Sequence, residues 1–226
     1  MASKIELLWK QALKCFTGCQ IPGYVFSSKN FEKLTNLMNE ITAEDVSVNK
    51  NMLDFVKAQP APMCAIDVFE NQDITIAVFI LKSGMTLPMH NHPEMHGLLK
   101  VINGVVKINS YTFETQDDEK TLELGRTISV TKHAPVTVRS TDPACVLTPI
   151  LKNIHEITCL EGPAAFLDVL SPPYDILGKY GEKSRLCTYF KVLQDDGTTD
   201  KVQLEVTNVP LDFYSHSIMY LGKPLS

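Results

Sequence analysis

Apolar residues at the N-terminus recur every three or four positions, which is the spacing of one face of an α-helix. The first such set is Ile5, Leu8, Trp9, Leu13 and Phe16. It predicts an amphipathic helix over residues 1–16, which ends before the turn residues of Gly18–Gly23. A second helix is predicted from Asn30, acting as its N-cap, to about Ile41.

From residue 61 onward the apolar residues gather in short runs of the kind that form β-strands. The predicted strands are Cys64–Phe69, Ile74–Leu81, His96–Ile102, Val105–Tyr111, Thr127–Thr131, Val136–Arg139, Cys145–Leu151, Ile154–Leu160, Ala165–Leu170, Cys187–Leu193 and Val202–Val206. Asn103-Gly104 suits a two-residue hairpin turn, in which both central residues take positive φ. Glu161-Gly162-Pro163 is a further turn signal. Many short strands separated by turns indicate an antiparallel sandwich or barrel.

Together these regions predict a mainly β fold in which N-terminal α-helices pack on a barrel. The chain of 226 residues is long enough to bury a sizeable core. We expect one domain over residues 1–226, with a helical extension at 1–60 and the barrel at 61–226.

Composition excludes several functional classes. The apolar share of 44% and the charged share of 21% are those of a soluble globular protein. A net charge of −5 without a basic stripe argues against a nucleic-acid partner. The longest apolar run, Ile76–Leu81, is far shorter than the ~20 residues of a membrane helix. Because the N-terminus has no secretory signal, we expect a cytoplasmic protein with reduced cysteines, with the nucleus as a further location.

Three of the six histidines, His90, His92 and His96, lie within seven residues. Residues two apart on a strand point to the same face, so His90 and His92 would present their imidazoles together. Neutral imidazoles suit a borderline transition metal, and this pair makes half of such a site. The remaining ligand is either His96, which is close in sequence, or a histidine from elsewhere.

The stretch Gly84–Gly104 resembles the first cupin motif, in which a glycine, two histidines, an acid and a second glycine line one mouth of a jelly-roll barrel. His96 stands where that motif carries its acid. The resemblance implies that the last histidine ligand comes from a later strand. His155, at the start of a predicted strand, fits this place better than His133, in a turn, or His216, in a weakly periodic segment.

Under this resemblance the fold is a cupin-type double-stranded β-helix. The implied metal ligands are His90, His92 and His155. His96 then becomes a lining residue or a partner of a ligand rather than a ligand.

Two stretches resemble the thiol dioxygenases of the cysteamine dioxygenase and plant cysteine oxidase family. They are PMHNHPEMHGLLKV at residues 88–101 and GPAAFLDVLSPPYD at residues 162–175. The likeness extends from about Leu7 to the final strands, and the animal cysteamine dioxygenases are the closer branch. Two positions depart from the family, which generally has Asp in place of Asn91 and Gly in place of Glu94.

This resemblance implies an Fe(II) site that adds O2 to a thiol and gives a sulfinic acid. The implied substrates are cysteamine and peptides that begin with cysteine, whose oxidation would feed an O2-sensing degradation pathway. Two alternatives remain: a cupin dioxygenase or isomerase of a carbon substrate, and a metal-binding cupin without enzymatic activity. We expect a monomer.

Asp168 lies in a predicted strand that is apolar on both faces, where an unpaired carboxylate would cost several kcal/mol. We therefore expect a partner for it, either a structural donor or a component of the site. The resemblance places Asp168 in the substrate pocket, where a carboxylate suits an aminothiol. Tyr174 looks like the family's pocket tyrosine, and the alternative is a loop aromatic that caps the core.

Cys187 and Tyr189 are two residues apart on a predicted strand and would share a face. In the animal cysteamine dioxygenases a Cys and a Tyr at this spacing can form a thioether crosslink. The alternative is an unmodified buried pair.

Overall fold

The computed structural model describes residues 2–119, 121–175, 178–180, 185–195 and 197–225. The helices are α1 (Lys4–Phe16), α2 (Ser28–Asn39), the 3-10 helix η1 (Glu44–Val46), α3 (Lys50–Ala58) and α4 (Gln116–Glu119). The strands are β1 (Met63–Glu70), β2 (Thr75–Leu81), β3 (Thr86–Asn91), β4 (His96–Phe113), β5 (Thr127–Lys132), β6 (Val136–Arg139), β7 (Cys145–Leu147), β8 (Ile154–Ser171), β9 (Tyr189–Gln194), β10 (Lys201–Thr207) and β11 (Ser215–Ser217).

The two N-terminal helices form as their apolar spacing predicts. Ser3 caps α1 by accepting a hydrogen bond from the Glu6 N–H. Ser27, and not Asn30, caps α2, because the Asn30 N–H donates to the Ser27 hydroxyl. A third helix, α3, has no counterpart among the predicted elements. It has nine residues, of which Met52 and Val56 are buried.

Strands β4 and β8 each run for 18 residues and pair with one another along most of their length. The predicted hairpin at Asn103-Gly104 and the predicted turn at Glu161–Pro163 are therefore wrong. The register shifts there instead, so the paired strands bend together without reversing direction. Gly104 has φ +77°, and a Cβ on it would lie 2.4 Å from the Glu161 carbonyl oxygen. Gly104 has the positive φ expected in a hairpin turn, but in the structure it lies in a β-bulge.

The bend lets β4 and β8 contribute to two facing layers. The first half of β4 pairs with β7, and the second half of β8 pairs with β2. The second half of β4 pairs with β6, and the first half of β8 pairs with β3. An apolar cluster that includes Leu99, Ile108, Ile157 and Phe166 fills the space between the layers. The predicted mainly β barrel with N-terminal helices is confirmed.

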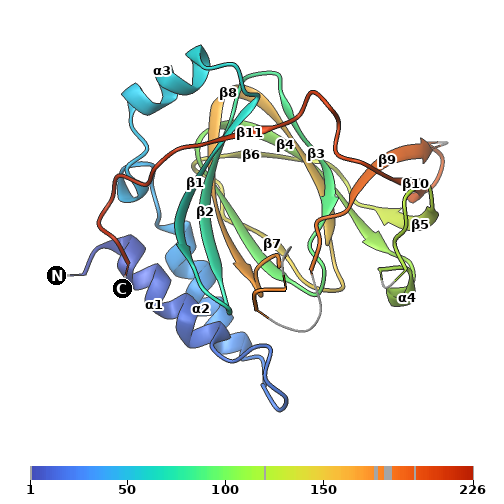
Figure 1. Cartoon of the computed structure of the whole chain (residues 1–226), viewed down its shortest axis with the longest axis horizontal. Helices are drawn as coiled ribbons and strands as arrows, with labels where there is room; N and C mark the ends of the chain where they lie inside the picture. Colours follow the sequence, from blue (N-terminus) through green and yellow to red (C-terminus); the bar gives the residue numbers. More distant parts are fainter. Residues whose placement is uncertain (1, 120, 176–177, 181–184, 196, 226) are drawn as a thin grey trace.

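Helices α1 and α2 cover the outer face of the layer that contains β1 and β2 (Figure 1). The C-terminal segment crosses this side, where β11 pairs in parallel with β1, and its end lies beside α1. On the opposite side, β5, β9 and β10 enclose a separate apolar cluster with the start of β8 and the end of β4. In the described part of the chain, no helix has the length and apolarity needed to cross a membrane.

Candidate metal centre and its cavity

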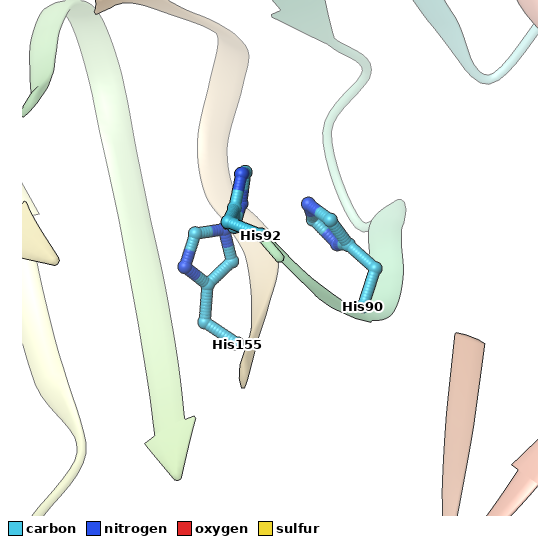
Figure 2. A group of neighbouring side chains, drawn as sticks. All are labelled: His90, His92 and His155. Atoms are coloured by element: carbon cyan, nitrogen blue, oxygen red, sulfur yellow. The ribbon is translucent and has the colours of Figure 1, made fainter. Parts of the chain in front are cut away.

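Three histidines from two segments that are far apart in sequence meet at one end of the barrel interior. His90 on β3 lies directly opposite His155 on β8, and His92 follows the end of β3. His155 points to the same face as Ile157, which lies in the interior cluster. The imidazoles gather around a common space in Figure 2, and the potential ligand atoms lie within 4.8 Å of one another.

Hydrogen bonds fix which ring nitrogen is free in two of the histidines. The His90 Nδ1 lies 2.8 Å from the Pro88 carbonyl oxygen, which can only accept, so this nitrogen carries the proton. The Tyr174 hydroxyl donates to the Asn91 carbonyl oxygen at 2.6 Å and accepts from His92 Nδ1 at 2.9 Å. Both histidines therefore keep the lone pair of Nε2 for a metal.

The electrostatics keep the cluster uncharged. Burial lowers the pKa of His90 to about 4. Burial, and then the neighbouring imidazoles, hold the pKa values of His92 and His155 well below the usual range for histidine. The Nε2 atoms of His92 and His155 lie 3.3 Å apart. Two neutral, buried imidazole nitrogens at this separation fit the coordination sphere of a transition metal.

Asn153 holds His92 in place and was not predicted from the sequence. Its side-chain oxygen accepts from the His92 N–H at 3.1 Å, and its amide nitrogen donates to the His92 carbonyl oxygen at 2.6 Å. Asn153 is buried and lies two residues before His155. Asn153 therefore connects the backbone of His92 to the start of β8, the strand that carries His155. An asparagine before a strand gives no sequence signal for this role.

The other histidines lie away from the cluster. His96 faces the N-terminal helices, where its ring stacks on Phe26 with centroids 4.4 Å apart and also contacts Phe16 and Phe31. The expectation that His96 is not a ligand agrees with the structure, but the expectation that it lies beside the ligands is wrong. His133 pairs with the Thr112 hydroxyl at 2.7 Å, and His216 is exposed on β11.

Asp168 lies on β8, is 8% exposed and makes no side-chain hydrogen bond or ion pair with the described residues. The structural donor that its burial predicts is thus absent from the described part of the chain. Burial raises the pKa of this carboxyl well above its usual range. Its Oδ1 is a buried acceptor with no donor among the described residues. This is expected of a group whose partner is a bound ligand.

Tyr174, Cys187 and Tyr189 form a second group next to His90 and His92. Tyr189 lies opposite His90 in the β3–β9 pairing, and Cys187 precedes β9. Burial raises the pKa of the Cys187 thiol to about 11, although the nearby Tyr174 and Tyr189 hydroxyls act in the opposite direction. The Tyr174 hydroxyl contacts His92 directly, so this residue does more than cap the core.

A cavity of about 520 Å³ opens from this end of the barrel to the surface. His155, Asp168 and Ser110 lie in its wall, together with Leu99 and Cys145. Leu99 pairs with Asp168 on one side and with Cys145 on the other, so the three side chains share the interior face. The strand pattern alone gives no indication of this cavity.

Comparisons with known proteins agree with the chemistry of this site. A family model described as PCO_ADO matches residues 37–224. The chain is 33% identical over 229 residues to the 2-aminoethanethiol dioxygenase of Homo sapiens, covering 86% of this chain and 82% of that protein. It is 32% identical over 177 residues to plant cysteine oxidase 2 of Arabidopsis thaliana, covering 74% of this chain and 59% of that one.

Among solved structures, KdgF from Halomonas sp. is similar over 51% of this chain and 84% of that chain, with 15% identity and a TM-score of 0.36. A cupin superfamily protein from Desulfitobacterium hafniense is similar over 54% and 86%, with 11% identity and a TM-score of 0.35.

Proposed function

Because this chain belongs to the PCO_ADO family, we propose that it is an Fe(II)-dependent thiol dioxygenase that converts an aminothiol to a sulfinic acid. The observation that carries the proposal is the cluster of three buried, neutral histidines, His90, His92 and His155, which includes no carboxylate from the described residues. The overall reaction is R–SH + O2 → R–SO2H. Sulfur loses four electrons, and both oxygen atoms of O2 enter the product.

Iron would supply the oxygen chemistry and a Lewis-acid position for the thiolate. Three neutral ligands leave its full charge uncompensated, which favours an anionic sulfur over a neutral one. The Cys187 thiol, with its raised pKa, is a poor metal ligand by comparison.

The residues around the histidines have separate tasks. Tyr174 accepts a hydrogen bond from His92 Nδ1–H and so orients the ring. Asn153 fixes the backbone of the same ligand. The apolar wall at Leu99 and Ile108 excludes water from the thiol.

We assign Asp168 to the binding of the substrate's ammonium group. Its carboxylate is buried in the cavity wall that also contains His155, and no donor among the described residues pairs with it. A cation placed there would remove the cost of the buried charge. Cysteamine and an N-terminal cysteine both carry an ammonium two carbons from sulfur. Oxidation of an N-terminal cysteine would give this chain a role in O2 sensing.

A mass-resolved oxidation assay tests the proposal. Protein loaded with Fe(II) should add two oxygen atoms to cysteamine or to a peptide that begins with cysteine. The same peptide with alanine in first place should remain unchanged. If neither thiol gains oxygen while iron is bound, the chain is not a thiol dioxygenase. Turnover of a carbon substrate, or metal binding without any turnover, would then favour the two alternative kinds of cupin.

A further inference from the structure

The cavity beside the metal centre is much larger than the smallest candidate substrate. Its volume is about 520 Å³. At ~30 Å³ for each heavy atom, cysteamine with its four heavy atoms needs on the order of 100 Å³. By the same measure an N-terminal cysteine followed by one leucine residue needs on the order of 400 Å³. The cavity therefore has room for a second residue.

Two polar groups of the cavity wall belong to the proposed site, and both lie on β8: His155 and Asp168. On β6, Val136 lies on the same face as Val138 of the interior cluster, and Leu147 at the end of β7 lies on the same face as Cys145. A substrate whose thiol and ammonium lie beside the two polar groups must place its next group against this apolar wall.

The apolar wall continues to the surface. Val136 is 41% exposed and Leu151 48%, and both belong to the cavity lining. Isolated exposed apolar residues are ordinary, but two that line one opening favour a ligand that covers them.

Two other charged groups lie in the lining. Asp142 already accepts a hydrogen bond from the Arg139 N–H at 2.7 Å. Lys152 makes no side-chain hydrogen bond or ion pair with the part of the chain that is described. An acidic second residue could pair with Lys152, so it is a competing occupant that the experiment must separate from an apolar one.

We propose that this cavity is a specificity site for the second residue of a chain that begins with cysteine, and that it selects an uncharged apolar side chain. The inference rests on the proposed thiol dioxygenase function and goes beyond it, because it names the residue that follows the oxidised cysteine. The ammonium lies on Asp168, and the second side chain lies against Val136, Val138 and Leu147.

The primary test compares four peptides that differ only at the second residue: leucine, asparagine, aspartate and glycine. Leucine and asparagine are close in size and both uncharged, so their ratio isolates the apolar contact. We expect kcat/KM to be about tenfold higher for leucine than for asparagine, the range that apolar pockets give for such differences. Equal values for all four, or the highest value for aspartate, would overturn the inference while leaving the proposed dioxygenase function intact.

Binding without turnover gives an independent readout. Peptides with serine in place of the first cysteine lack the reactive thiol, and their affinities can be measured by calorimetry. Ser-Leu should bind more tightly than Ser-Asn by a similar factor. If the two affinities are equal, the preference does not arise in this cavity.

A matched pair of variants locates the preference. Val136→Asn places an amide in the lining at a position 41% exposed, and Val192→Asn places the same amide at a position 45% exposed on β9, outside the lining. The Leu/Asn ratio of kcat/KM should fall at least threefold in Val136→Asn and stay constant in Val192→Asn. Leu151→Asn, at a lining position 48% exposed, serves in the same way if Val136→Asn does not fold. An unchanged ratio in a folded lining variant contradicts the proposal.

Discussion

The Tyr174 hydroxyl bridges the Asn91 carbonyl and the proposed metal ligand His92, and its two contacts determine the tautomer of His92. A phenylalanine at this position keeps the ring and removes the acceptor for Nδ1–H. The imidazole then loses the constraint that leaves Nε2 free for the metal.

Tyr174→Phe should therefore weaken metal affinity by about 10- to 100-fold, the range observed for partners of ligating histidines. The measurement is a metal titration with a chromophoric competitor. Tyr24→Phe is the matched control, because it removes a hydroxyl that donates to the Cys15 carbonyl oxygen far from the site. Equal affinities in the two variants would contradict the role assigned to Tyr174.

Asp168 combines a cost to stability with the substrate-binding role that we propose for it. Its pKa is raised in the folded protein, so its ionised form opposes folding once the pH rises above the unfolded-state pKa. Asp168→Asn should stabilise the metal-free protein near neutral pH and have little effect at acid pH, where the native carboxyl is protonated in both states. Thermal unfolding at the two pH values measures this difference. Asp67→Asn, on the exposed side of β1, is the control.

The same variant should lose activity. Removal of the charge that pairs with the substrate's ammonium should lower kcat/KM for cysteamine by about 100-fold, in line with the loss of a buried charge partner. A thiol without an amine should show no such loss. A parallel drop for both thiols would mean that Asp168 supports the site rather than the ammonium.

At the scale of elements, the decisive feature is the bend shared by β4 and β8. Each strand is unusually long, and the bend lets each of them join both layers of the barrel. His155 lies at one end of β8 and Asp168 lies beyond the bend. The bend therefore sets the separation between His155, a proposed metal ligand, and the Asp168 carboxylate, which we propose binds the substrate.

Gly104→Ala tests this bend. The new Cβ would meet the Glu161 carbonyl oxygen and would also sit at positive φ, so the cost should reach about 3 kcal/mol. Gly125→Ala has a similar φ of +82° but nothing within 4 Å, and it should cost about 1 kcal/mol. Urea unfolding of both variants gives the comparison. Equal losses would mean that backbone strain alone, and not the close approach to β8, makes glycine necessary.

At the scale of the whole molecule, a metal held between β3 and β8 links the two strands that carry its ligands. A ligand at 100 times its dissociation constant stabilises the native state by ~2.7 kcal/mol. For a chain of this size that corresponds to a rise in Tm of roughly 5–10 °C. Fe(II) added without oxygen should produce this rise.

His155→Ala should abolish the rise in Tm, because it removes the ligand that only β8 supplies. His216→Ala, at an exposed position on β11, should keep it. Differential scanning calorimetry under nitrogen measures both. A full shift in the His155→Ala protein would place the metal elsewhere.

Much of this protein could be read from the sequence. The helical spacing around Leu8 and Trp9 and the short apolar runs determined the N-terminal helices and the mainly β class. Local periodicity is enough for this, because each element is defined by its own neighbours along the chain. The histidine pair at His90 and His92 was visible for the same reason.

The tertiary structure decided which distant groups meet. Asn103-Gly104 satisfies the local rule for a hairpin, and only the pairing of β4 with β8 makes it a bulge. His96 is closest in sequence to His90 and His92. However, the alternation of side chains along β4 points it outward, where its ring stacks on Phe26. Asn153, the unpartnered Asp168 and the cavity depend on contacts between strands that are remote in sequence. Local patterns carry no record of such contacts, because register and layer packing are set by the whole barrel.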